Sequence, residues 1–189
     1  MAADLPTGGV AYDVGSHIGY AALALSQVAG SSGRIFAFEI DSASIDTLRA
    51  NVASNASDSV EVVERAVDAV SGHVEFVSYD CELVSQIAVE GEPTDGTVTK
   101  VESVSLDDFV YRDGNPPPDV IKIAVTANEA NIVKGADRLM REHGPVIYCL
   151  TEPESRPDVL AIVADHGDYE HTGSIGEQPQ EYLRLAPKS

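Results

Sequence analysis

Short apolar runs alternate with stretches of helical periodicity along the whole of this 189-residue chain. Apolar runs bounded by Gly, Pro or polar residues predict buried strands, whereas apolar residues three and four positions apart predict amphipathic helices. We expect strands at residues 10–14, 34–39, 60–67, 73–78, 101–106, 120–125 and 145–150. We expect helices at residues 19–29, 41–54, 107–111, 128–141 and 159–166, and a closing hairpin of residues 169–173 and 181–185. Residues 79–100 show little periodicity and predict a loop or an insertion.

This alternation predicts an α/β fold of the Rossmann-like type. Its central sheet should be mostly parallel, with helices on both faces and an antiparallel hairpin at the C-terminal end. The sequence contains no internal repeat or linker, and its length suits one domain over residues 1–189. Such sheets bind ligands outside the carboxyl ends of their strands. The residues that follow the predicted strands are therefore the first candidates for a site.

The first two predicted strands end in residues that suit a nucleotide-binding site. The first runs into D-V-G-S-H-I-G, from Asp13 to Gly19, and the second ends at Glu39. Gly15 allows a tight turn out of the strand, and Gly19 lets the following helix begin close to a ligand. A carboxylate at the tip of the second strand can accept hydrogen bonds from both ribose hydroxyls. We therefore expect Glu39 to bind a ribose.

The spacing of the glycine loop indicates which nucleotide fits. Dinucleotide-binding loops have a central glycine that admits a pyrophosphate, but His17 occupies that position here. A nucleoside without phosphate fits better, which disfavours an NAD-dependent oxidoreductase. S-adenosylmethionine (SAM) is such a nucleoside, and its positive charges suit a site edged by Asp13.

At the level of motifs, the chain resembles FkbM-type methyltransferases over roughly residues 9–152. The D-V-G-S-H-I-G-Y segment from Asp13 is similar to their D-V-G-A-N-I-G-Y, and R-I-F-A-F-E-I-D from Arg34 is similar to G-R-V-Y-A-F-E-P-D. Later segments match S-L-D-D-F, I-K-I and V-L-K-G-A. The resemblance implies methyl transfer from SAM, usually to a hydroxyl of a sugar, a polyketide or a related small molecule.

The resemblance also implies which residues bind SAM. Asp13, Gly15, Ser16 and Gly19 would line the methionine part, Glu39 would bind the ribose, and Arg65 and Ala66 would lie near the adenine. His17 and Ile40 complete the cofactor-binding residues that we expect.

The central strand departs from the family motif. I-K-I-D-V-E-G-A-E becomes I-K-I-A-V-T-A-N-E, so Ala124 and Thr126 replace two acids and only Glu129 remains. Lys122 is expected to face the side of the sheet opposite to Ala124. No catalytic residue is identified; the candidate bases are His17, Glu129 and an acidic loop that contains Asp80 and Glu82. The alternative to an enzyme is a catalytically impaired SAM-binding module with a regulatory role.

Composition adds a strong negative charge. Thirty-one acids against twelve bases give a formal net charge of -19, beyond the usual magnitude of about 2–8 for a small domain. We expect a salt-rich environment that screens this charge, with an ordinary acidic protein as the alternative. Nucleic acids and anionic membranes are unsuitable partners, because no basic stripe is present. Cys81 and Cys149 suit reduced thiols rather than a metal site, and the N-terminal residues lack signal-peptide features, so we expect a cytoplasmic location.

Overall fold

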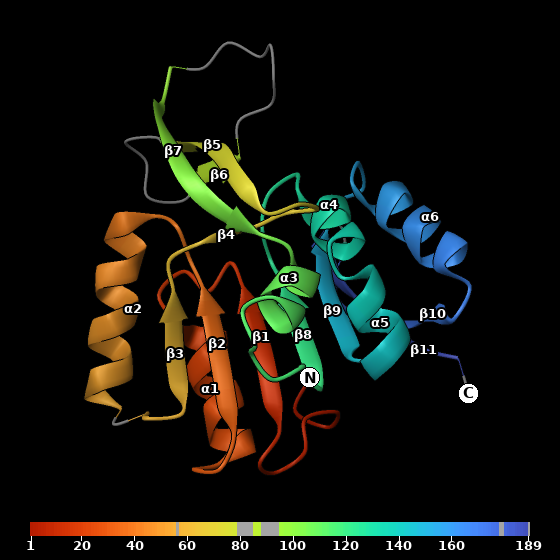
Figure 1. Ribbon diagram of the computed structural model, residues 1–189, viewed down its shortest axis with the longest axis horizontal. Coiled ribbons are helices and arrows are strands. Elements are labelled where there is room, and N and C mark those ends of the chain that lie inside the picture. Colours follow the sequence, from red (N-terminus) through yellow and green to blue (C-terminus); the bar gives the residue numbers. More distant parts are fainter. Residues whose placement is uncertain (56, 79–84, 88–94, 178–179, 189) are drawn as a thin grey trace.

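The computed structural model describes residues 1–55, 57–78, 85–87, 95–177 and 180–188 (Figure 1). Its main sheet contains β1 (Val10–Val14), β2 (Arg34–Phe38), β3 (Val60–Val63), β8 (Val120–Ile123), β9 (Val146–Thr151), β10 (Tyr169–Glu177) and β11 (Gln180–Pro187). The strand order is β10-β11-β9-β8-β1-β2-β3. The pairs from β3 to β9 are parallel, whereas β11 is antiparallel to β9 and to β10. The predicted mostly parallel sheet and its closing antiparallel hairpin are confirmed.

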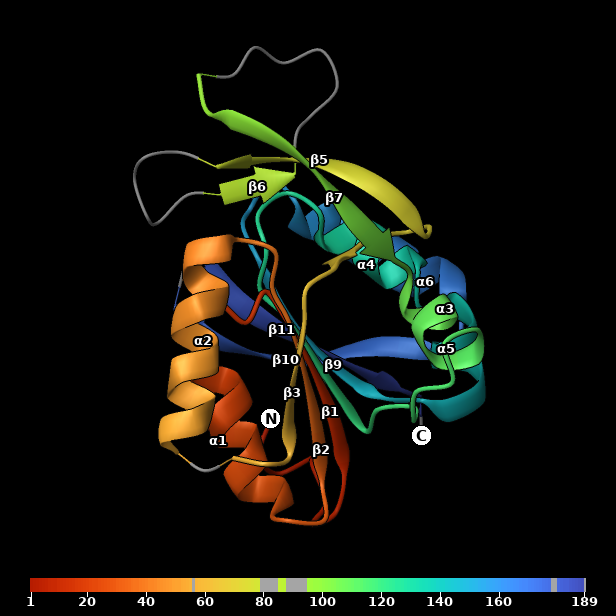
Figure 2. The ribbon, with the colours of Figure 1, turned by 60° about the vertical axis from the view of Figure 1, so that its left-hand side comes forward.

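Helices cover both faces of this sheet, as predicted (Figure 2). They are α1 (Tyr20–Ala29), α2 (Ser42–Ser54), α3 (Leu106–Tyr111), α4 (Glu129–Lys134), α5 (Asp137–His143) and α6 (Arg156–His166). Residues of α1 and α2 pack with the small side chains of Ala11 and Ala37 on one face. Residues of α3 to α6 pack with Tyr12 and Phe36 on the other. Neighbouring strand residues thus serve opposite faces, because successive side chains of a strand alternate.

An aromatic cluster forms the core beneath α3. Tyr12, Phe36, Phe38 and Phe109 lie edge to face with ring centroids 4.9–5.7 Å apart. The Tyr12 hydroxyl donates a hydrogen bond of 2.6 Å to the carbonyl of Pro116, so its polar atom is satisfied. Such ring pairs each contribute about 0.5–1.5 kcal/mol beyond burial. The cluster packs α3 against β1 and β2, and its member at the end of β2, Phe38, lines the cavity described below.

A second sheet lies across the carboxyl ends of the parallel strands (Figures 1 and 2). It is formed by β4 (Ala66–Val67), β5 (Gly72–Ser78), β6 (Ser85–Ile87) and β7 (Thr97–Val104), in the order β4-β7-β5-β6. Two expectations are therefore wrong. The strand expected at 60–67 is divided between two sheets, and part of the loop expected at 79–100 belongs to β6 and β7. The remainder of that loop, residues 79–84 and 88–94, lies outside the described residues.

The helix expected at 128–141 is also interrupted, between α4 and α5. A Cβ atom at Gly135 would lie 2.4 Å from the carbonyl oxygen of Asp68, so a glycine lets the chain pass this backbone. Asp107 then caps α5 from outside the helix. Its carboxylate accepts hydrogen bonds from the amides of Arg138 (3.0 Å) and Leu139 (2.8 Å).

Candidate cofactor site

A cavity of about 360 Å³ opens at the carboxyl ends of the parallel strands. β1 and β8 are neighbours in the sheet, and the connections that follow them run to opposite sides. The chain passes from β1 to β2 on one side and from β8 to β9 on the other. This is the topological switch point at which open α/β sheets bind ligands. The lining comes from the ends of β1, β2 and β9 and from the segments that follow β1, β2, β3, β8 and β9, with Ala66, Val67 and Phe76 from the second sheet. Six of the predicted cofactor residues line the cavity: Gly15, His17, Glu39, Ile40, Arg65 and Ala66.

The glycine loop that follows β1 is held by its own backbone amides. The amides of Gly15 and Ser16 donate to the carbonyl of Phe38 (3.1 and 3.0 Å), and that of Gly19 donates to the carbonyl of Ser16 (2.8 Å). The amide of His17 donates to Glu39 Oε2 (2.7 Å). A loop that cradles a pyrophosphate needs such amides to face the ligand. Here these four amides already have partners, which agrees with the sequence argument against a dinucleotide.

Both glycines of this loop have left-handed backbone conformations. Each also lies so close to another part of the protein, the backbone of Ala124 or a side chain of α2, that a side chain would not fit. Gly15 has a φ of 73°, and a Cβ atom there would lie 2.1 Å from the carbonyl oxygen of Ala124. Gly19 has a φ of 89°, and a Cβ atom there would lie 2.4 Å from Leu48. The tight turn predicted at Gly15 is confirmed. The close approach at Gly19 is to a side chain of α2, and Gly19 does not line the cavity within the described part of the chain.

His17 also has a left-handed conformation, with a φ of 50°. Asn and His are both enriched among the few non-glycine residues that adopt it. The replacement of the family's Asn by His17 is therefore compatible with the backbone. The ring is exposed and borders the cavity.

Glu39 connects the glycine loop to the end of β2. Its Oε1 accepts from the amides of Ile40 (2.8 Å) and Asp41 (2.9 Å), and its Oε2 accepts from His17. A carboxylate offers about four acceptor positions, so these three bonds leave room for a further donor such as a ribose hydroxyl. The side chain is half-buried and lines the cavity.

Asp13 has a different environment from the one expected. Its carboxylate is fully buried and forms an ion pair of 2.8 Å with Lys122, while the described cavity lining includes neither Asp13 nor Ser16. Lys122 Nζ also donates to the carbonyl of Gly15 (2.8 Å). The pair thus holds the glycine loop from behind.

The contribution of Lys122 was missed because of a wrong expectation about its direction. Residues 122 and 124 are two positions apart, a spacing that returns a strand side chain to the same face. The pairing of Asp13 with Lys122 in parallel register between β1 and β8 is the signal that could have identified it.

Arg65 and Ala66 border the cavity where the chain crosses from β3 to β4. The Arg65 guanidinium forms an ion pair of 2.7 Å with Asp113 and lies 5.2 Å from the centre of the Phe109 ring. These contacts fix Arg65 over the aromatic cluster.

The altered motif after β8 also borders the cavity. Ala124, Thr126 and Glu129 all line it, so the positions of the two missing acids face the same space as Glu39. Ala127, which stands where the family has glycine, has a φ of 61°. Burial raises the pKa of the Glu129 carboxyl, and the nearby Glu152 carboxylate raises it further.

Two candidate bases, Asp80 and Glu82, lie outside the described residues. Among the residues that are described, no three His, Cys, Asp or Glu side chains could together hold a metal ion. Cys149 is a buried free thiol, whereas Cys81 falls in an undescribed segment. No helix in the described ranges is long and apolar enough to cross a membrane.

Comparison with known proteins supports the sequence resemblance. A family model described as "Methyltransferase FkbM domain" matches residues 13–172. The chain belongs to the FkbM methyltransferase family. Within the matched range, the FkbM domain includes the glycine loop, Glu39 and the altered motif.

A curated relative is the hexuronic acid methyltransferase AglP of Haloferax volcanii. It is 26% identical over 159 residues, which cover 82% of this chain and 62% of that protein. The FkbM domain thus spans less than two thirds of that relative's length.

Solved structures show the same fold. The FkbM methyltransferase from Methylobacillus flagellatus KT superposes with a TM-score of 0.68 at 18% identity, covering 94% of this chain and 43% of that chain. Fibrillarin from Aeropyrum pernix, in complex with SAM, superposes with a TM-score of 0.61 at 12% identity, covering 97% and 68%. The chain therefore has the class I SAM methyltransferase fold.

Proposed function

We propose that this FkbM domain binds SAM in the cavity after β1, β2 and β8 and transfers its methyl group to a hydroxyl of a saccharide or a related small molecule. The observation that carries the proposal is the combination of Glu39, which has acceptor capacity left, with a glycine loop whose amides bind the protein itself. This combination suits a ribose without a pyrophosphate. When bound, SAM supplies an electrophilic methyl group on a positively charged sulfur.

The residues of the chain would act mainly by positioning. Glu39 would hold the ribose, and Arg65 and Ala66 would border the adenine. The ion pair between Asp13 and Lys122 would keep the glycine loop in place. Orientation of this kind can supply several kcal/mol of a two-substrate reaction's barrier, about 7–11 kcal/mol in the best cases.

The name of AglP favours a saccharide acceptor. That relative is described as a hexuronic acid methyltransferase, and the similarity extends over most of this chain. We therefore expect sugars, including uronic acids, to be better acceptors than apolar alcohols.

A second candidate function is a SAM-binding module with little turnover. The observation that favours it is that Ala124 and Thr126 line the cavity where the family motif has acids. General-base assistance is typically worth about 10²–10⁴-fold, so its loss would slow catalysis strongly.

Release of S-adenosylhomocysteine (SAH) separates these two functions. The unaltered chain and an Ala124→Asp/Thr126→Glu variant would each be incubated with SAM and with methyl glucoside or methyl glucuronide. A control variant, Ala50→Asp/Thr47→Glu, adds the same acids on the exposed surface of α2. We expect the unaltered chain to release SAH only when a sugar is present. Of the two variants, only Ala124→Asp/Thr126→Glu should release SAH faster than the unaltered chain. Sugar-independent background rates in all three proteins, despite SAM binding, would instead favour the binding module.

A further inference from the structure

Among the described residues, Glu129 is the most deeply buried carboxylate that lines the cavity. Glu129 is the first residue of α4 and is only 2% exposed. Oε1 accepts a long hydrogen bond, 3.5 Å, from the Ser155 hydroxyl, and the backbone amide of Glu129 itself also interacts with the carboxyl group. Within the described residues, Oε2 has no hydrogen-bond partner. A buried acceptor without a partner is costly and rare in folded proteins, so this oxygen indicates a contact that a ligand would complete.

The backbone around Glu129 is firmly held. The side-chain amide of Asn128 donates to the carbonyl of Val67 (3.1 Å), and its oxygen accepts from Asn131 (2.9 Å). The first bond attaches the beginning of α4 to β4, and the second holds the Asn128 side chain against the first turn of α4. The carboxylate is therefore presented to the cavity by a fixed element.

The environment of this carboxylate suits a positive ligand. Burial disfavours its charged form, and the neighbouring Glu152 adds repulsion, so its pKa is raised. A cation at the cavity would relieve both effects, because an opposite charge nearby stabilises the ionised carboxylate. The family's acids at positions 124 and 126 are missing, so Glu129 is the buried acid that the described cavity lining retains after β8.

The order of the strands indicates which part of SAM would reach Glu129. Arg65 and Ala66 follow β3, Glu39 follows β2, and Glu129 comes after β8 on the other side of β1. With neighbouring strands about 4.8 Å apart, β2 and β8 are separated by roughly 10 Å. A nucleoside with its base near Arg65 and its ribose on Glu39 has its C5′ substituent, which carries the sulfur, left for the β8 side.

Resting on the proposed binding of SAM, we propose that Glu129 Oε2 is the counter-charge for the methylsulfonium group of SAM and makes the site prefer SAM to SAH. A sulfonium carries a positive charge but no N–H or O–H donor, so it is met by charge alone. SAH has the same ribose, base, amino and carboxyl groups but a neutral sulfur. An anion placed at the sulfur therefore favours substrate over product and assists release of SAH.

Isothermal titration with SAM, SAH and sinefungin tests this assignment. Sinefungin has a carbon bearing an amine in place of the sulfonium, so it also presents a positive charge there. The proteins compared are the unaltered chain, Glu129→Gln, and a control, Glu170→Gln, which removes an exposed acid from β10. We expect the ratio of SAM affinity to SAH affinity to fall roughly tenfold or more in Glu129→Gln, with SAH affinity nearly unchanged. The affinity for sinefungin should fall together with the affinity for SAM in Glu129→Gln. The Glu170→Gln control should bind all three ligands as the unaltered chain does.

A second variant and a stability measurement separate charge from folding. Ala124→Asp added to Glu129→Gln returns an anion to the same cavity, so the affinity ratio should recover in part. The Gln variant should also melt no lower than the unaltered chain at pH 8, because it removes a buried carboxylate whose pKa is raised.

The outcomes distinguish this inference from the proposed function. Equal weakening of SAM and SAH would assign Glu129 to the methionine amino group and overturn the inference. Loss of turnover with an unchanged affinity ratio would make Glu129 a base and overturn it too. Failure of the unaltered chain to bind any of the three nucleosides would overturn the proposed function itself.

Discussion

At the scale of single residues, the ion pair between Asp13 and Lys122 supports the glycine loop. Asp13 is fully buried, and Lys122 reaches both its carboxylate and the carbonyl of Gly15. The free-energy cost of burying a charge is offset only while its partner is present. Removing one member of the pair leaves the other charge buried and unpaired. The pair is therefore a strong determinant of loop geometry even though Asp13 does not line the cavity.

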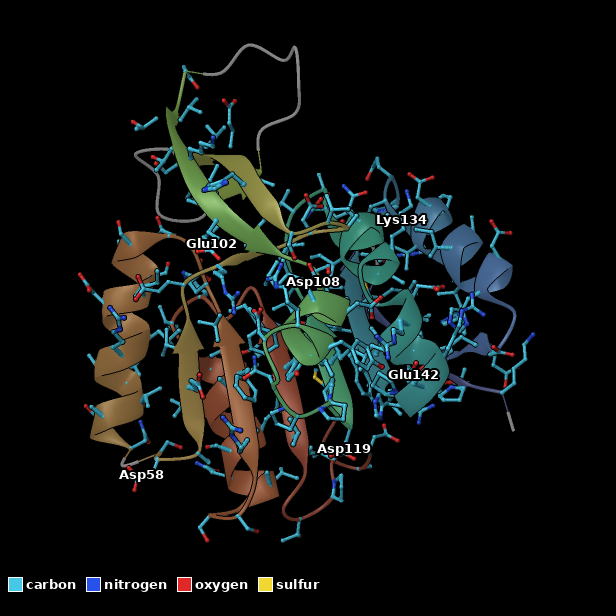
Figure 3. The ribbon with its side chains drawn as sticks, viewed as in Figure 1. Asp58, Glu102, Asp108, Asp119, Lys134 and Glu142 are labelled. Atoms are coloured by element: carbon cyan, nitrogen blue, oxygen red, sulfur yellow. The ribbon has the colours of Figure 1, made fainter. Side chains whose placement is uncertain are left out.

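Replacing Lys122 should consequently destabilise the protein more than replacing an exposed lysine. We expect Lys122→Met to lower the free energy of unfolding by about 3–5 kcal/mol, because it leaves the Asp13 carboxylate unpaired. Asp13→Leu combined with Lys122→Met should cost much less than the two single changes added together. The measurement is urea unfolding, with Lys134→Met on the exposed surface of α4 as the control (Figure 3). Strictly additive losses would show that the two side chains act independently.

The sequence was informative about residues whose role is local. Gly15, His17 and Glu39 follow predicted strands, and the positions of strand ends can be read from local patterns. The roles of Asp13 and Gly19 depend on partners far away in the chain, Lys122 and Leu48. Only the packed structure supplies those partners.

At the scale of elements, the helix that begins after the break between α4 and α5 is capped by Asp107. Gly135 passes close to the backbone of Asp68, and the next helix begins with amides that need acceptors. Asp107 lies in the segment that resembles S-L-D-D-F and supplies both acceptors from the beginning of α3. A helix cap thus joins two segments that are about 30 residues apart.

Removal of this cap should weaken α5. We expect Asp107→Ala to cost about 1–2 kcal/mol in the free energy of unfolding, since two helix amides lose their acceptor. Asp137→Ala removes an exposed acid from the same helix and should cost less than about 1 kcal/mol. Thermal melting of the two variants measures this difference. An equal decrease in melting temperature for both would contradict a capping role for Asp107.

Helices and strands were predicted well where the local sequence pattern determines them. They were predicted poorly where pairing with a strand distant in sequence determines them. The apolar residues on either side of residues 64–65 read as one strand, but pairing of Ala66 and Val67 with β7 moves them to a second sheet. Similarly, Thr97 to Lys100 have no apolar periodicity and become strand because β5 lies beside them. Long-range hydrogen bonding overrides such weak local preferences.

At the scale of the whole molecule, the negative charge is distributed rather than concentrated. Figure 3 labels Asp58, Glu102, Asp108, Asp119 and Glu142, which come from well-separated parts of the fold. Several arginines pair with acids at the surface, but such exposed pairs contribute only about 0–1 kcal/mol each. The net charge of -19 therefore produces repulsion that these pairs cannot remove.

Salt should accordingly stabilise the protein. We expect the melting temperature to rise clearly between about 0.1 M and 2 M KCl, because the Debye length shortens from about 10 Å toward about 3 Å. A variant with fewer exposed acids, Asp46→Asn/Glu75→Gln/Glu170→Gln, should show a smaller rise. A melting temperature that stays flat or falls with KCl in both proteins would contradict the role given to the acidic surface.

The most direct test of the account as a whole is the affinity of SAM for the unaltered chain and for a Glu39→Ala variant. Titration should show that the unaltered chain binds SAM and that the variant, shown to be folded by circular dichroism, binds it about ten- to a hundredfold more weakly. This factor corresponds to the loss of about 1.5–3 kcal/mol from charge-assisted hydrogen bonds to the ribose. An exposed-acid control, Asp46→Ala, should bind as the unaltered chain does. Unchanged SAM affinity in folded Glu39→Ala, or no SAM binding by the unaltered chain, would contradict the central claim.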